Sequence, residues 1–256
     1  MKTPFAVISD LHANLEALEA VLADIDAQGL GEIACLGDIV GYGPDPGPVA
    51  DLVRERATKA VAGNHDWALI NRPLGFNPLA KDVIEYTRDM LEPKFYHLFG
   101  ETRERWAYLE GLPTVLEEGD LAFVHASLRD PLMDYCFGDR HPMWNPKQLE
   151  EIFPKVKRIC FAGHTHYPAV IRDDAVCWYP KDDAPRFPLE AGRKYIVNVG
   201  SVGQPRDGDP RACYAVFEGD AVRYRRVPYD VERTRDKIIA IDAIEVRLGD
   251  RLREGK

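Results

Sequence analysis

The feature that most constrains the fold is the regular alternation of apolar runs and helical patterns in the first 62 residues. Residues 5–9, 32–36 and 59–62 are short apolar runs typical of buried strands. Between them, apolar side chains recur at helical spacing over residues 14–27, and a shorter helix is predicted near residues 49–56. A strand, helix, strand order of this kind favours an α/β fold.

The remaining sequence predicts further helices, strands and hairpins without a domain boundary. Helices are expected from the Asn77-Pro78 and Asn145-Pro146 starts, over residues 101–110 and over residues 231–252. Strands are expected over residues 158–162, 169–172, 176–179 and 194–199, and hairpins over residues 114–127 and 213–227. Because no repeat, low-complexity tract or linker interrupts this pattern, residues 1–256 are expected to form a single domain.

Composition restricts the partners more than the fold. The 45% hydrophobic and 29% charged residues are typical of a soluble globular protein, and the net charge of -9 disfavours nucleic acid as a partner. Five scattered cysteines without a C-x-x-C pair indicate reduced thiols, as in a cytoplasmic protein. The N-terminal apolar run is too short for a signal sequence, and no run is long enough to span a membrane.

Potential metal ligands follow the ends of successive predicted strands. The motifs are S-D-L-H, G-D, G-N-H-D, a single His and G-H-T-H, and they hold five of the seven histidines. In open α/β sheets the carboxyl ends of strands form the crevice where sites assemble, so these side chains can converge. The residues are Asp10, His12, Asp38, Asn64, His65, His125, His164 and His166.

The chemistry of this set favours divalent cations of the first transition row. Oxygen and imidazole ligands without thiolates suit Mn²⁺, Fe, Co²⁺ or Zn²⁺. Without His65, the seven remaining residues are too many ligands for one ion and suit two ions that share a carboxylate. Taken singly, Asp10 or Asn64 could cap the following helix, and His125 could be a packed strand residue. Such local roles do not explain why all the motifs fall in order at strand ends.

The ordered motifs resemble the signature of calcineurin-like metallophosphoesterases, which reads D-x-H, G-D-x-x, G-N-H-[DE], H and G-H-x-H. The blocks are present at Asp10/His12, Gly37/Asp38, Gly63–Asp66, His125 and Gly163–His166, and they cover about two thirds of the chain. The resemblance implies a four-layer α/β/β/α sandwich of two mixed sheets flanked by helices.

The resemblance also implies a role for each motif residue. It assigns Asp10, His12 and His166 to one ion and Asn64, His125 and His164 to the other, with Asp38 bridging both. Mn²⁺ is the first expectation, and Fe, Zn²⁺, Ni²⁺ and Co²⁺ are compatible with the same ligands. His65 is implied as the general acid near the leaving oxygen, and the neighbouring Asp66 either orients the His65 ring or caps a helix.

Two such cations suit phosphoester hydrolysis. A hydroxide that bridges them, held with Asp38, can attack phosphorus in line, and the metal charge rather than the protein's net charge attracts the phosphate. The expected substrates are small phosphorylated molecules, namely phosphomonoesters or small phosphodiesters, nucleotides among them. A catalytically silent scaffold of the same fold and a sensor of phosphorylated ligands are the alternatives, although every ligand position is filled.

Substrate-binding residues are predicted with less support from the motifs. Phosphoprotein phosphatases continue the second block as G-D-x-V-D-R-G, and Gly41 and Tyr42 replace its acid and arginine here, which disfavours that activity. Asn14, Asn198 and Arg206 are the candidates for substrate contacts, and Arg206 lies in a glycine-rich loop that could approach an anion. Three loop aromatics either stack on a nucleoside or pack locally: Tyr42, Trp67 and Phe76.

Overall fold

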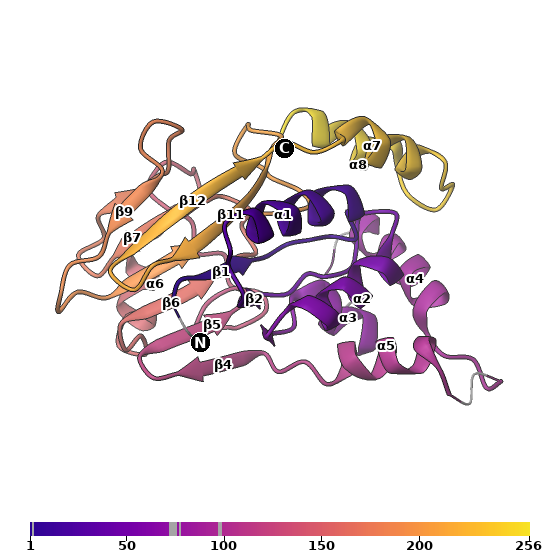
Figure 1. Ribbon diagram of the computed structural model, residues 1–256, viewed down its shortest axis with the longest axis horizontal. Coiled ribbons are helices and arrows are strands. Elements are labelled where there is room, and N and C mark those ends of the chain that lie inside the picture. The colour runs from indigo at the N-terminus through magenta and orange to yellow at the C-terminus, as the bar shows by residue number, and fades with distance from the viewer. Residues whose placement is uncertain (2, 72–75, 77, 97–98) are drawn as a thin grey trace.

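The protein consists of two six-stranded sheets packed face to face, with helices against their outer surfaces (Figure 1). This architecture comes from a computed structural model that describes residues 1, 3–71, 76, 78–96 and 99–256. It is the two-sheet α/β sandwich that the resemblance implied. None of the helices in the described ranges is both long and apolar enough to cross a membrane.

Both sheets mix parallel and antiparallel strands. The first sheet has the order β3 (Lys59–Ala60), β2 (Ile33–Cys35), β1 (Phe5–Ile8), β11 (Ala212–Phe217), β12 (Ala221–Val227) and β9 (Arg186–Pro188). The second has the order β4 (Val115–Glu118), β5 (Leu121–Val124), β6 (Ile159–Ala162), β10 (Tyr195–Asn198), β7 (Ala169–Arg172) and β8 (Cys177–Trp178). Strands β1, β2 and β3 are parallel to one another, as are β5, β6 and β10.

Strand β1 shows why its sequence reads as an unbroken apolar run. Phe5 and Val7 point into the core between the sheets, whereas Ala6 and Ile8 belong to the cluster beneath the outer helices. The Phe5 ring lies 5.2 Å from that of Phe217, between centroids. A strand buried on both faces requires apolar residues at every position rather than at alternate ones.

The helices form the outer layers. They are α1 (Leu15–Ala27), α2 (Pro46–Arg56), α3 (Asn64–Ile70), α4 (Pro78–Leu91), α5 (Glu101–Glu110), α6 (Pro146–Ile152), α7 (Val231–Ile239) and α8 (Val246–Asp250), followed by a 3₁₀ turn at Arg251–Arg253. Helices α1 and α2 cover the first sheet, and α6 covers the second. Helix α2 begins at Pro46 rather than near Val49, because the proline occupies its first turn. The predicted cap Asn77 lies outside the described residues.

The prediction of one helix over residues 231–252 is wrong. The chain turns after Ile239, and α7 and α8 lie together above α1 in Figure 1. The turn lets Leu248 and Leu252 join Ile238 in one buried cluster. In a straight helix Leu252 would lie about 20 Å from Ile238 along the axis, too far to share that cluster. The edge strand β9 was not predicted either, because only partner β12 gives its short segment a strand conformation.

Candidate metal centre

The predicted ligands of the first ion lie together at the ends of β1 and β6. Nε2 of His12 is 3.2 Å from Nε2 of His166, and Nε2 of His166 is 3.1 Å from Oδ1 of Asp10. All three side chains are buried. Donor atoms of these three residues lie close enough together to hold one metal ion.

The predicted ligands of the second ion form an adjacent group. Nε2 of His125 is 2.9 Å from Oδ1 of Asn64 and 3.1 Å from Nδ1 of His164. Oδ2 of Asp38 lies 3.3 Å from Nε2 of His125 and 3.6 Å from Nε2 of His12. Asp38 therefore faces both groups, as a bridging carboxylate must.

Hydrogen bonds outside the cluster fix two of the imidazoles. Nδ1 of His125 is 2.9 Å from the carbonyl oxygen of Leu36, and Nδ1 of His166 is 2.5 Å from that of Gln204. A carbonyl can only accept, so each Nδ1 carries the hydrogen and each Nε2 points inward, where the neutral form of the ring presents a lone pair. Converging lone pairs at this spacing repel unless a proton or cation lies between them, so the donor set fits divalent cations.

The backbone of the ligand loops adopts the left-handed region that side chains rarely occupy. The φ angles are 53° at Asp10, 46° at His12, 50° at Asp38, and 63° at both His164 and His166. Such conformations cost free energy and persist where the surrounding structure enforces them, which is common at functional sites. The ligand loops therefore keep unfavourable φ angles, and their side chains point inward.

Two motif glycines are required by close packing. A Cβ atom at Gly63 would overlap the backbone and carboxylate of Asp38, and one at Gly163 would overlap Ser9 and the carboxylate of Asp10. The glycines of G-N-H-D and G-H-T-H thus allow ligand-bearing loops to touch.

Charge in the cluster is concentrated on the two carboxylates. Burial opposes ionisation of Asp10 and Asp38, but His166 and His125 respectively hold the pKa of each carboxyl well below its usual range. Burial lowers the pKa of His164 to about 3 and that of His12 well below 6.5. Despite its burial, the charge of Asp38 raises the pKa of His125 to about 9. Two carboxylates outweigh the one protonated imidazole, that of His125, so the cluster is anionic and attracts cations.

His65 lies at the same site but uses its ring differently. It lines a cavity of about 150 Å³ together with Asp38, Asn64, His164 and Arg206. Its backbone N–H donates to Oδ1 of Asp38 at 2.9 Å, while Nδ1 of its ring is buried without a hydrogen-bond partner. Burial lowers the pKa of His65 to about 4, so the ring is neutral at pH 7. A ring nitrogen of His65 lies within 4.8 Å of a carboxylate oxygen of Asp38 and of a ring nitrogen of His12.

Asp66 caps a helix rather than orienting His65. Its carboxylate accepts hydrogen bonds from the backbone N–H groups of Gly63 at 2.9 Å, Ile39 at 3.0 Å and Val40 at 3.1 Å. These bonds tie the loop that carries Asp38 to the start of α3. Of the two roles considered for Asp66, the structure has the cap.

Arg206, the predicted phosphate-binding residue, lines the cavity. Its guanidinium donates to Oε1 of Gln204, from Nη2 at 2.7 Å, and its central carbon is 6.0 Å from the Tyr42 ring centroid. No ion pair to Arg206 occurs within the described part of the chain, so its charge remains available to an anion.

The other two substrate-binding candidates have structural roles. Asn14 caps α1 by accepting from Ala17 at 3.1 Å, and its amide donates to the carbonyl of Gly203 at 2.8 Å and to Tyr229 at 3.2 Å. The amide of Asn198 donates to the carbonyl of Gly163 at 2.6 Å and to Thr165 at 2.9 Å. Both amide hydrogens of each residue are used, so neither is available to a substrate.

Aromatic side chains surround the cavity, but not only those predicted. Tyr42 and Phe76 line it, with ring centroids 4.5 Å and 5.2 Å from that of His65, whereas Trp67 is not among its walls. Tyr135 was missed: its ring centroid lies 4.2 Å from that of His164. No motif surrounds Tyr135 in the sequence, so only the tertiary structure identifies it.

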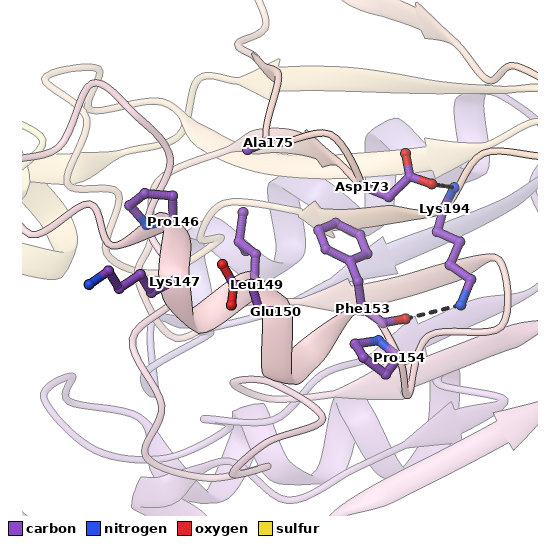
Figure 2. Close-up of a pocket in the computed structure, with 9 residues that line it drawn as sticks. All are labelled: Pro146, Lys147, Leu149, Glu150, Phe153, Pro154, Asp173, Ala175 and Lys194. Carbon is purple, nitrogen blue, oxygen red and sulfur yellow. Dashed lines mark hydrogen bonds between the residues drawn. The ribbon is translucent and has the colours of Figure 1, made fainter.

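A separate groove of about 510 Å³ runs beside α6 and is lined by other residues than the metal centre. Figure 2 shows its walls, where Nζ of Lys194 donates to the carbonyl of Phe153 at 3.1 Å. None of the predicted site residues lines this groove.

Fold and cluster together define a metal-binding α/β/β/α sandwich. The chain belongs to the calcineurin-like phosphoesterase superfamily, because the profile of that superfamily's domain matches residues 4–221. It is 33% identical over 265 residues to an uncharacterized protein of Methanocaldococcus jannaschii, with 100% of each chain covered.

Solved structures agree with this assignment. A metallophosphoesterase from Sphaerobacter thermophilus is 39% identical, with a TM-score of 0.81 and 99% of each chain covered. A hypothetical protein from Pyrococcus horikoshii shares the fold at 21% identity, with a TM-score of 0.75 and coverage of 99% of this chain and 98% of that one.

Proposed function

We propose that the protein hydrolyses phosphomonoesters or small phosphodiesters with two divalent cations, Mn²⁺ being the first choice. The observation that carries this proposal is the position of Asp38 between two groups of buried ligands beside the cavity lined by His65 and Arg206. The superfamily assignment supports the reaction class.

The ligand side chains form two groups, one for each proposed cation. Asp10, His12 and His166 would hold one cation, and Asn64, His125 and His164 the other, with Asp38 between them. Bound there, two divalent cations supply an activated water and neutralise charge on the phosphoryl oxygens.

Two further side chains would act on the substrate directly. Arg206 would bind a phosphoryl oxygen, because its charge faces the cavity and has no carboxylate partner among the described residues. The His65 ring would donate a hydrogen bond to the leaving oxygen, and in its protonated form it would transfer a proton and return to the neutral imidazole. The cavity thus offers both a phosphate anchor and a proton donor.

Metal add-back tests the proposal. Metal-stripped protein is assayed with p-nitrophenyl phosphate and bis-p-nitrophenyl phosphate after addition of Mn²⁺, Zn²⁺, Ni²⁺, Co²⁺ or Mg²⁺. We expect metal-dependent turnover that Asp38→Ala abolishes and that Asp242→Asn, at an exposed carboxylate outside the site, leaves intact. The ratio of the two rates distinguishes a monoesterase from a diesterase. Tight metal binding without turnover of either ester would reject the enzyme and favour a silent scaffold or sensor.

A further inference from the structure

A second cavity, beside the metal centre, is walled by aromatic rings. Its volume is about 290 Å³, near the lower end of small-molecule pockets at roughly 300 Å³. His141, Tyr167 and Tyr179 supply the rings, and Arg140 supplies a positive charge. No sequence motif singled out these residues.

Two segments of the chain contribute neighbouring residues to both cavities. Tyr167 directly follows His166, and Asp207 directly follows Arg206, so each cavity takes one member of each pair. Residues of the two cavities are therefore neighbours along the chain at two places, 166–167 and 206–207.

A continuous series of ring contacts also links the two cavities. The Tyr135 ring lies 4.2 Å from His164 and stacks on Phe137 at 5.6 Å, between centroids. Phe137 in turn stacks on His141 at 3.6 Å, with the two planes only 9° apart. The wall of aromatic rings thus begins at a predicted metal ligand and ends in the second cavity.

The walls of the second cavity are held in place before any ligand arrives. The Tyr179 hydroxyl accepts from the backbone N–H of Arg140 at 3.0 Å and donates to Oδ1 of Asp139 at 2.8 Å. A Cβ atom at Gly138 would overlap that hydroxyl, so the glycine permits the close approach. Fixed walls lose little conformational freedom on binding, which favours affinity.

The polar groups of the cavity suit a flat, uncharged ring system. The backbone N–H of Met143 donates to Nδ1 of His141 at 3.2 Å, so the imidazole carries its hydrogen on Nε2 as a donor. The guanidinium of Arg140 lies 4.3 Å from the Tyr179 ring centroid. The carboxylate of Asp207 forms an ion pair with Arg226, so its negative charge does not oppose binding of a ligand.

We propose that this cavity binds the base of a nucleoside phosphate whose phosphate lies at the metal centre. The inference rests on the proposed function and narrows its substrates to nucleotides. Stacking on aromatic rings is tolerant of base identity, because every base has a π face. We therefore expect discrimination between esters with and without a base, rather than between one base and another.

Adenosine binding tests the cavity without requiring catalysis. Metal-free protein is titrated with adenosine and with ribose in a calorimeter. We expect adenosine to bind at least tenfold more tightly, and His141→Ala and Tyr167→Leu each to weaken it at least fivefold. Phe99→Leu, at an exposed aromatic outside the cavity, should bind adenosine as the parent protein does. Equal affinities for adenosine and ribose, or unchanged binding by both cavity variants, would overturn the proposal.

Kinetics separate this inference from the proposed function. With Mn²⁺ bound, kcat/KM is compared for adenosine 5′-monophosphate and ribose 5-phosphate, which differ only in the base. We expect a ratio of at least ten that falls toward one in His141→Ala. Hydrolysis of both esters with equal kcat/KM would reject the base site and leave the phosphoesterase standing. If neither is hydrolysed, the p-nitrophenyl esters decide on the phosphoesterase and the adenosine titration decides on the cavity.

Discussion

At the scale of single residues, His65 combines access to the cavity with a buried, unpartnered ring nitrogen. If it donates a proton to the leaving group, His65→Asn lowers kcat by roughly 10²- to 10⁴-fold for an alkyl phosphate. The loss should be much smaller for p-nitrophenyl phosphate, whose leaving group needs no proton. Steady-state kinetics on both esters measure the difference. An equal loss for both would assign His65 to binding or structure.

A different effect is expected for Arg206, because its guanidinium would already bind the phosphate in the enzyme–substrate complex. Arg206→Ala should lower kcat/KM roughly 10- to 100-fold, the effect of one hydrogen bond to a charged group. Arg247→Ala, at an arginine that is 68% exposed, serves as the matched control. If kcat/KM is the same in Arg206→Ala as in that control, Arg206 is only a loop residue.

Gly163 tests the link between packing and metal binding. A methyl group there would overlap Ser9 and Asp10, so Gly163→Ala should destabilise the fold by about 1–3 kcal/mol and weaken binding of one cation. Gly31→Ala, where a Cβ meets nothing within 4 Å, should do neither. Urea unfolding and metal titration of the two variants provide the measurements. Unaltered metal affinity in Gly163→Ala would mean that the Asp10 loop can shift freely.

The candidate ligands were predictable because each pattern is local. An apolar run identifies its strand, and the D-x-H or G-H-x-H that follows identifies a polar strand end. The roles of Asn14 and Asn198 were not predictable, since their amides bond to residues far away in sequence, such as Gly203 and Gly163. Tyr135 was missed for the same reason: its position over His164 is purely tertiary.

At the scale of elements, α8 shows how packing overrides helical periodicity. The apolar positions of residues 231–252 fit one helix, yet burial of Leu248 beside Ile238 requires a turn between them. Periodicity reports which face of a helix is apolar and says nothing about where a helix must stop. The prediction of the two-sheet sandwich depended on the motif resemblance, because the sequence of a single strand does not specify its neighbours in the sheet.

The same cluster tests whether the C-terminal helices share the main domain. Leu248→Ala should lower the free energy of unfolding by about 2–4 kcal/mol, the usual range for emptying a buried leucine site, and keep a single transition. Val246→Ala, at a side chain that is 48% exposed, should change it by less than about 0.5 kcal/mol. A separate early transition in calorimetry would show that residues 231–256 unfold on their own and would contradict the single domain.

At the scale of the whole molecule, a bridge between α1 and β12 makes stability depend on pH. Oδ2 of Asp24 accepts from Nε of Arg225 at 3.0 Å and from the Tyr214 hydroxyl at 2.6 Å. Although burial opposes it, these bonds hold the pKa of Asp24 below its ordinary value of 3.8. The folded state therefore binds the proton more weakly than the unfolded state does.

Asp24→Asn should consequently cost about 1 kcal/mol at pH 7, a figure that allows for solvent screening of the pair. The stabilisation by Asp24 is present above pH 3.8 and disappears as the pH falls below it, so the variant and parent should converge in acid. Urea unfolding at several pH values measures this. A difference that stays constant into acid would mean that Asp24 acts through shape rather than charge.

The loop after β10 has a consequence for when the proposed metal centre can form during synthesis. The backbone N–H groups of Val202 and Gly203 donate to the carbonyls of Ser9 and Asp10 at 3.0 Å and 2.9 Å, and Ser201 donates to Asp10 as well. The first ligand made by the ribosome is thus braced by residues made some 190 positions later. Because such distant contacts form late, a nascent chain carries its first ligands without a finished site. The proposed metal centre is therefore complete only after residues 201–203 have been synthesised and have joined the Asp10 loop.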